Sequence, residues 1–143
     1  MLEHRDGTER EDMILIDYRT GAFVTGNTES TKYGATGLTD AQYNAYANHK
    51  GSVAIVHNHP NSSRPSYTDI LTMHKQDKVD AVIAVGHDGS VHIVSDLDKD
   101  FDIETYWKIM YNKAMETYGD KEVSRIKATD ALYALGVFKY EKR

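Results

Sequence analysis

The sequence predicts an α/β (α+β) fold, in which a mixed β-sheet packs against helices. Two observations carry this prediction. Short apolar runs of strand length alternate with segments that carry helix caps or a helical spacing of apolar residues. Several of these runs are also joined by short turns, which is typical of hairpins. We therefore expect one sheet with helices against it, followed by a C-terminal helical extension at about 101–137.

The chain is expected to begin its regular structure with a hairpin. Residues 13–18 read as a largely buried strand, Arg19-Thr20-Gly21 as a turn, and residues 22–25 as the partner strand. Residues 26–37 are predicted to form a loop because they hold four flexible or turn-forming residues, Gly26, Asn27, Gly34 and Gly37.

Two capping boxes mark the starts of the next helices. Thr39-Asp40-Ala41-Gln42 predicts a short helix that runs to about His49, because the threonine hydroxyl can accept from the third amide of the helix while the glutamine reaches back. Ser66, with Asp69 three residues later, predicts a second helix that runs to about Gln76. Between these helices, the apolar residues 52–56 form a buried strand, and residues 58–65 form a polar loop.

The second half of the chain predicts a further hairpin and then helices. Residues 80–86 and 90–94 read as strands joined by the tight turn His87-Asp88-Gly89. Beyond Asp96 the chain is expected to turn helical, with Gly119 as the stop of the first helix. Residues 121–135 form one helix, or two if Thr129 begins a new one. The first of these C-terminal helices has a 3, 4, 7 spacing of apolar residues that predicts a buried core or contact face, namely Ile103, Tyr106, Trp107, Met110 and Ala114.

Length and composition are those of a globular domain. The 143 residues predict a single domain over residues 1–143, with a core at about 11–95. A net charge of −5 argues against a nucleic-acid partner. There is no apolar run of 18 residues, which argues against a membrane partner, and residues 1–6 are polar and unlike a secretory signal. The abrupt start is compatible with a domain of a longer protein.

The absence of cysteine limits the chemistry of any site. With no cysteine in the chain, disulfides and thiolate metal sites are excluded, and a reducing, cytoplasmic location fits. Zinc deaminases, which share a similar layered fold, need His-x-Glu together with Pro-Cys-x-x-Cys, so that class is excluded as well.

The candidate site lies where an apolar strand ends in two histidines. His57 and His59 are two residues apart, so on an extended segment both side chains project from the same face. Asp69 can return to them if the loop folds the next helix back over the strand end. Two imidazoles and one carboxylate are a common ligand set for catalytic Zn²⁺, which keeps a fourth position for water. The alternative interpretation is two loop histidines and an ordinary helix cap.

Zinc hydrolysis also needs a donor for the oxyanion and a carboxylate base that is not a ligand. Ser66 lies one helical turn before Asp69, so it faces the same cleft and could donate to the developing oxyanion. The remaining histidines are interpreted as structural, and His92 is expected to be half-buried in its strand; the others are His4, His49, His74 and His87.

These residues resemble a known family. His57-Asn58-His59-Pro60 followed by Ser66-x-x-Asp69 is similar to the signature of the JAMM (JAB/MPN+) metalloproteases, an upstream Glu, then His-x-His-Pro, then Ser-x-x-Asp. The resemblance implies an MPN-like (cytidine-deaminase-like) fold, zinc held by His57, His59 and Asp69, and Ser66 assisting the oxyanion. Six residues separate His59 from Ser66, one fewer than usual in the family, which together with His-Asn-His-Pro points to the bacterial and phage branches.

The resemblance also implies an upstream glutamate as general base. The candidates are Glu3, Glu9, Glu11 and Glu29. Glu11 is favoured because phage-type relatives place the glutamate just ahead of the first strand, six residues before an aspartate at the hairpin, here Asp17. Glu29, in the glycine-rich loop, is the second choice.

The function predicted from the resemblance is a zinc-dependent peptidase or isopeptidase that hydrolyses an amide with a metal-activated water. Its partner would be a peptide or protein, and an isopeptide, a ubiquitin-like tail and a peptidoglycan cross-link all remain open. The alternative is a non-catalytic JAB-like scaffold module of a phage-related assembly, which would add association with a phage particle to the cytoplasmic location. A DNA-repair-named bacterial branch shares His-Asn-His-Pro, but the acidic charge gives DNA contact no support.

Overall fold

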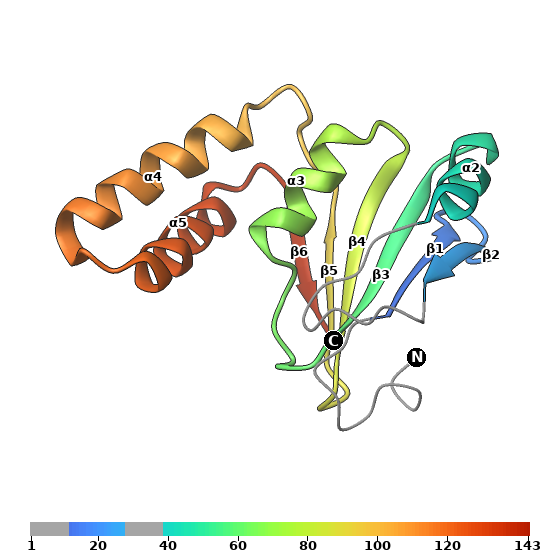
Figure 1. Ribbon diagram of the computed structural model, residues 1–143, viewed down its shortest axis with the longest axis horizontal. Helices are drawn as coiled ribbons and strands as arrows, with labels where there is room; N and C mark the ends of the chain where they lie inside the picture. The colour runs from blue at the N-terminus through green and yellow to red at the C-terminus, as the bar shows by residue number, and fades with distance from the viewer. Residues whose placement is uncertain (1–11, 28–38) are drawn as a thin grey trace.

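A computed structural model describes residues 12–27 and 39–143 of the chain. Within these ranges the chain forms a six-stranded mixed sheet and four helices, which confirms the predicted α+β class (Figure 1). The strand order is β2-β1-β3-β4-β5-β6. β3 and β4 are parallel, and the other neighbouring strands are antiparallel.

The bounds of the elements follow the predicted order closely. The strands are β1 (Met13–Asp17), β2 (Phe23–Asn27), β3 (Val53–His59), β4 (Val79–Gly86), β5 (Val91–Ser95) and β6 (Lys139–Lys142). The helices are α2 (Asp40–Asn48), α3 (Tyr67–Lys75), α4 (Ile103–Tyr118) and α5 (Lys121–Leu135).

The first hairpin is longer than predicted. β2 continues to Asn27, so the prediction of a loop from residue 26 was wrong for residues 26 and 27, and the remainder of that loop lies outside the described residues. Gly26 pairs with Ile14, and a Cβ added to Gly26 would lie 2.5 Å from the Ile14 Cγ2 atom. Glycine here permits close strand contact and is therefore not a loop signal.

β3 is also longer than predicted, and the difference concerns the candidate site. The strand was expected over residues 52–56, but it runs through both histidines to His59. Its neighbours explain the extension, because the parallel pairing with β4 continues until His59 stands opposite Gly86. The two histidines are therefore held by strand backbone and not by a loop.

The helix boundaries confirm the capping signals. Thr39 with Gln42 and Ser66 with Asp69 both form complete capping boxes. α4 ends at Gly119, whose φ of +65° is the left-handed conformation that favours glycine. α5 begins after its N-cap, Asp120, and continues without interruption to Leu135, so Thr129 does not start a second helix.

A strand that the sequence did not predict, β6, is the last strand of the sheet. β6 pairs with β5 and covers what would otherwise be an edge. The prediction that His92 is half-buried was wrong, since His92 is only 5% exposed. Its burial follows from the pairing of β5 with β6. Its Nδ1 atom lies 2.7 Å from the Tyr140 hydroxyl of β6.

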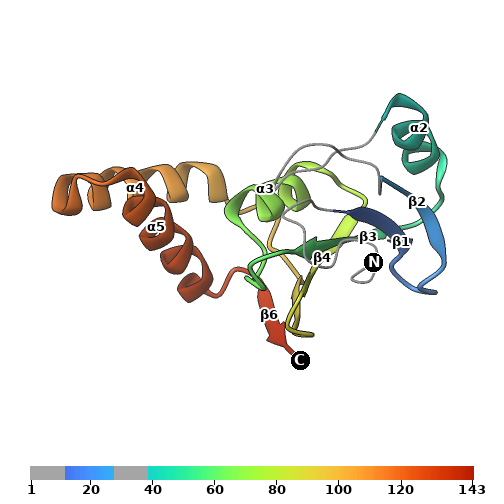
Figure 2. The ribbon, with the colours of Figure 1, turned by 60° about the horizontal axis from the view of Figure 1, so that its bottom comes forward.

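The helices are arranged in two groups. α2 and α3 lie over one face of the sheet, whereas α4 and α5 form an antiparallel pair that extends to one side (Figures 1 and 2). Of the predicted face of α4, Ile103 and Ala114 are buried. The other members are part-buried, and the Trp107 ring stacks on Tyr67 of α3 at 4.2 Å. No helix in the described part of the chain is both long and apolar enough to cross a membrane.

Candidate metal centre

His57 and His59 are presented by the alternation of β3. Both side chains share a strand face with the core residue Ile55, and they are 7% and 6% exposed. His57 stands opposite Met13 of β1 on one side and Ala84 of β4 on the other. Because both neighbouring strands are in register, the imidazoles occupy fixed positions at the end of the apolar face.

Asp69 is oriented by the same hydrogen bonds that cap α3. The Ser66 amide donates to Asp69 Oδ2 at 2.8 Å, and the Asp69 amide donates to Ser66 Oγ at 3.2 Å. The capping box therefore fixes the carboxylate while it stabilises the helix start. The structural and the functional interpretation of these two residues are compatible.

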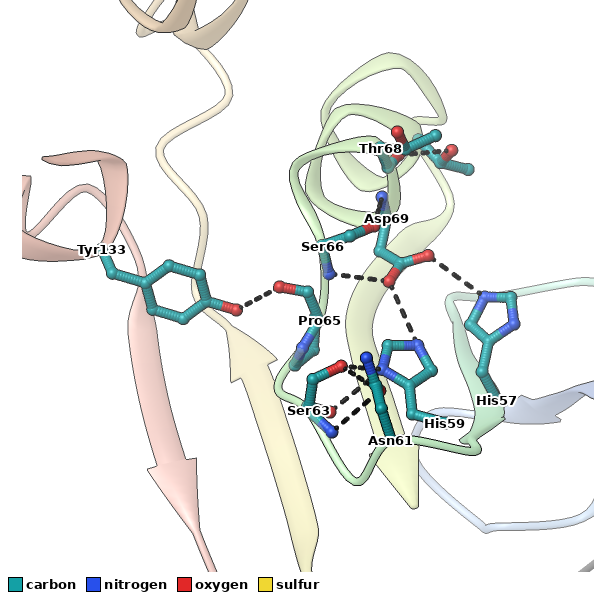
Figure 3. Close-up of polar contacts among 10 residues, drawn as sticks. His57, His59, Asn61, Ser63, Pro65, Ser66, Thr68, Asp69 and Tyr133 are labelled. Atoms are coloured by element: carbon teal, nitrogen blue, oxygen red, sulfur yellow. Dashed lines mark hydrogen bonds and ion pairs between the residues drawn. The ribbon is translucent and has the colours of Figure 1, made fainter. Parts of the chain in front are cut away.

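The loop folds α3 back so that Asp69 faces both histidines (Figure 3). Asp69 Oδ1 lies 3.6 Å from His57 Nε2, and Asp69 Oδ2 lies 3.4 Å from His59 Nε2. Two ligand atoms of one tetrahedral zinc ion are separated by about 3.4 Å, given metal–ligand bonds of about 2.0–2.1 Å. Each histidine faces a different carboxylate oxygen of Asp69. Across residues 12–27 and 39–143, no three or more His, Cys, Asp or Glu side chains are already arranged as a metal site.

The protonation of His59 is set by its second ring nitrogen. His59 Nδ1 lies 3.0 Å from the backbone carbonyl oxygen of Ser63. A carbonyl only accepts hydrogen bonds, so Nδ1 carries the proton and, in the neutral ring, Nε2 presents a lone pair toward Asp69. Metal-ligating histidines characteristically donate their other N–H in this way. The donor types and the tautomer of His59 therefore suit a cation.

Burial and neighbouring charged groups shift the pKa values of Asp69 and His57. Burial raises the pKa of Asp69, but the imidazoles of His59 and His57 and the Ser66 amide outweigh it and lower the pKa to about 2. Burial lowers the pKa of His57; Asp69 opposes this shift and His59 adds to it. The buried His57 Nδ1 has no hydrogen-bond partner among the described residues.

The loop between the histidines and α3 is held from within and from the sheet. The Asn61 side chain accepts from the amide and the hydroxyl of Ser63. Ser62 has a φ of +56°, and its hydroxyl accepts from the Asp88 amide at 3.1 Å. His92 Nε2 lies 3.2 Å from the Ser62 carbonyl oxygen. These contacts fix the short loop that carries Asp69 back to β3.

The same loop is also held by α5. The Tyr133 hydroxyl donates to the Pro65 carbonyl oxygen at 2.6 Å, as Figure 3 shows. Arg64 stacks over the Tyr133 ring at 3.7 Å and pairs with Asp130 at 2.6 Å. Sequence reasoning missed these contacts, because nothing in the sequence near Tyr133 connects it to a motif that ends 64 residues earlier.

The predicted general base cannot be placed in this geometry. Glu11 and Glu29, like Glu3 and Glu9, lie outside the described residues. Asp12, which follows Glu11 in sequence, is fully buried. Its backbone carbonyl accepts from the Asn58 amide at 3.3 Å, and its own amide donates to the Asn58 side chain. The start of β1 is thus bonded to the residue between the two histidines.

Three of the other histidines make contacts that fit their predicted structural role. His49 pairs with Asp17 at 2.8 Å, His74 lies 2.8 Å from the Phe101 carbonyl oxygen, and His87 lies 3.4 Å from the Asn58 side-chain nitrogen. His4 lies outside the described residues.

Comparison with known proteins adds no relative to this description. No family model matches the chain, and comparison with curated proteins and with solved structures finds no match either.

Proposed function

We propose that this chain is a zinc-dependent peptidase or isopeptidase of the JAMM type with an MPN-like fold, in which His57, His59 and Asp69 hold the metal. The observation that carries the proposal is the position of the Asp69 carboxylate, whose two oxygens face the Nε2 atoms of His57 and His59 at 3.6 and 3.4 Å. The two histidines and the Ser-x-x-Asp segment meet as the resemblance to that family requires.

Electrostatics supports a cation at this point. His59 Nδ1 donates to the Ser63 carbonyl oxygen, so Nε2 of the neutral ring presents its lone pair to the Asp69 carboxylate oxygen 3.4 Å away. Two electron-rich groups at this separation repel each other unless a proton or a metal ion lies between them. A buried site with two imidazoles and a carboxylate is a common environment for zinc.

The residues around the donors have separate roles in the proposed reaction. Bound zinc lowers the pKa of water to about 7, so that hydroxide is available at neutral pH. Ser66 would donate its hydroxyl hydrogen to the carbonyl oxygen of the amide as negative charge develops there. Glu11 would accept a proton from the attacking water and transfer it to the leaving amine as the C–N bond breaks.

The choice of Glu11 over Glu29 has one supporting contact. Asp12, the next residue after Glu11, is bonded through its backbone to Asn58, which lies between His57 and His59.

An assay of amide hydrolysis tests this proposal. The zinc-loaded protein is incubated with a peptide, a lysine-linked isopeptide and a peptidoglycan cross-link fragment, beside His57→Ala and Glu11→Gln. We expect cleavage of at least one class by the wild type and none by either variant. Equal cleavage by wild type and His57→Ala contradicts the proposal. If the protein binds zinc but cleaves none of the three substrates, the hydrolase proposal is replaced by the scaffold alternative.

A further inference from the structure

A pocket of about 280 Å³ adjoins the candidate metal centre. It lies between α2, α3 and the face of the sheet that carries the histidines. Two of its lining residues are the metal donors His57 and Asp69. The other described lining residues come from β1, α2, β3, α3 with its C-cap, and β4, namely Met13, Leu15, Tyr43, Tyr46, Ile55, Thr68, Thr72, Gln76 and Val79.

We propose that this pocket binds a large apolar side chain of the substrate, aliphatic or aromatic, next to the amide that is cleaved. The inference rests on the proposed hydrolase function and adds a substrate preference to it. Because His57 and Asp69 form part of its wall, the pocket is close enough to the proposed metal site to receive a side chain next to the reacting carbonyl. The side chain in it would help to fix the amide relative to Ser66 and the donors.

The size of the pocket favours one large side chain. An apolar protein cavity of about 150 Å³ is sufficient to bind benzene. The present pocket, at about 280 Å³, is larger than that and is therefore wide enough for a phenylalanine or leucine side chain. It is at the lower limit of pockets that enclose whole drug-sized molecules, which begin at about 300 Å³.

The chemistry of the lining favours an apolar occupant. Leu15, Ile55 and Val79 are core residues with exposed fractions of 5% or less. Among the polar side chains of the lining, the Tyr46 hydroxyl donates to Gln76 Oε1 at 3.3 Å, and the Thr72 hydroxyl donates to the Thr68 carbonyl oxygen. The lining residues that belong to the described part of the chain include no lysine or arginine.

The first test measures binding without zinc and without hydrolysis. The zinc-free protein, with labelled methyl groups, is titrated with N-acetyl-phenylalaninamide, N-acetyl-leucinamide and N-acetyl-glycinamide. We expect the methyl signals of Leu15, Ile55 and Val79 to shift with the first two probes and not with the third. Absence of shifts, or equal shifts with the glycine probe, overturns the inference.

A matched pair of variants tests the location of binding. Thr72 and Thr117 both bond to the carbonyl four residues earlier, on exposed faces of α3 and α4. Thr72→Trp narrows the pocket, whereas Thr117→Trp places the same bulk on the helical extension. We expect the affinity for the phenylalanine probe to fall at least tenfold in Thr72→Trp and to remain unchanged in Thr117→Trp. Equal affinity in both variants, with native-like spectra, overturns the inference.

The outcomes of this test are distinct from failure of the hydrolase proposal. If the probes bind in the pocket but no amide is cleaved, the hydrolase proposal fails and the apolar binding site stands. If amides are cleaved but the probes do not bind, the pocket is not the specificity site. With active enzyme, the kcat/KM ratio of phenylalanine to glycine substrates should fall about tenfold in Thr72→Trp, as loss of one apolar contact predicts.

Discussion

The Tyr133 hydroxyl and the Pro65 carbonyl oxygen are joined by a 2.6 Å hydrogen bond across 68 positions of sequence. Pro65 is buried and directly precedes Ser66, whose backbone amide holds Asp69. Arg64 strengthens the contact because it stacks on the same tyrosine ring and pairs with Asp130. The C-terminal helical pair is therefore joined to the loop that brings the carboxylate to the histidines.

Tyr133→Phe should weaken metal binding without removing a ligand. The substitution leaves the Pro65 carbonyl without its donor, and partners that orient metal ligands typically contribute about 10–100-fold in affinity. We expect a decrease of this size in zinc affinity, measured by chelator competition. Tyr111→Phe, on α4, is the control and should bind zinc as the wild type does. Equal affinity in both variants would show that the hydrogen bond does not position Asp69.

Ser66→Gly should separate catalysis from helix capping. Glycine retains the backbone amide that donates to Asp69 and is tolerated at an N-cap at a cost of only a few tenths of a kcal/mol. Loss of an oxyanion donor lowers kcat by about 10²–10³-fold. Thr39→Gly, in the equivalent capping box of α2, should lose similar stability with no loss of kcat. If Ser66→Gly and Thr39→Gly have the same kcat and the same unfolding midpoint, Ser66 is not the oxyanion donor.

Glu11→Gln should abolish hydrolysis and leave the zinc content intact. A general base contributes about 10²–10⁴-fold to the rate, and the proposed ligands do not include this carboxylate. The measurements are kcat and metal content, with Glu29→Gln as the matched control. Full activity in Glu11→Gln, with loss of activity in Glu29→Gln, would transfer the role to Glu29.

Asp17 should give the folded state a measurable dependence on acid. The Thr20 amide and then the His49 imidazole lower the pKa of Asp17 to about 2, below its value in the unfolded chain of about 3.9. The stabilisation is therefore complete above pH 4 and is lost as the pH falls toward 2. Urea unfolding at pH 5, 4, 3 and 2 should show a smaller loss of stability in Asp17→Asn than in the wild type. An identical slope in the two proteins would exclude this contribution.

The sequence was sufficient for the local features of the fold. Both capping boxes, the Gly119 stop and the β4–β5 hairpin depend on short-range chemistry, and each is present. β6 was missed because its four residues, Lys139 to Lys142, are three charged residues and one tyrosine, without an apolar run. Its place in the sheet depends on pairing with β5, which is a long-range contact. The burial of His92 follows from that pairing and was mispredicted for the same reason.

The candidate site shows the same division between local and long-range information. The spacing of His57 and His59 and the cap at Ser66 predict which side chains share a face, and the structure brings these side chains together with Asp69. The supports of the loop come from Asp88, His92 and Tyr133, which lie on later elements. No local spacing rule connects these residues to the motif.

The most direct test of the central claim is the zinc content of the purified protein beside three alanine variants. His57→Ala and Asp69→Ala remove proposed ligands. His49→Ala breaks a comparable His–Asp pair, with a separation of 2.8 Å, in which Asp17 takes the place of Asp69. The proposal predicts about one zinc per chain in the wild type and in His49→Ala, and a large loss in the other two, because a catalytic zinc needs three protein ligands. A wild-type protein that carries no more zinc than His57→Ala and Asp69→Ala would contradict it.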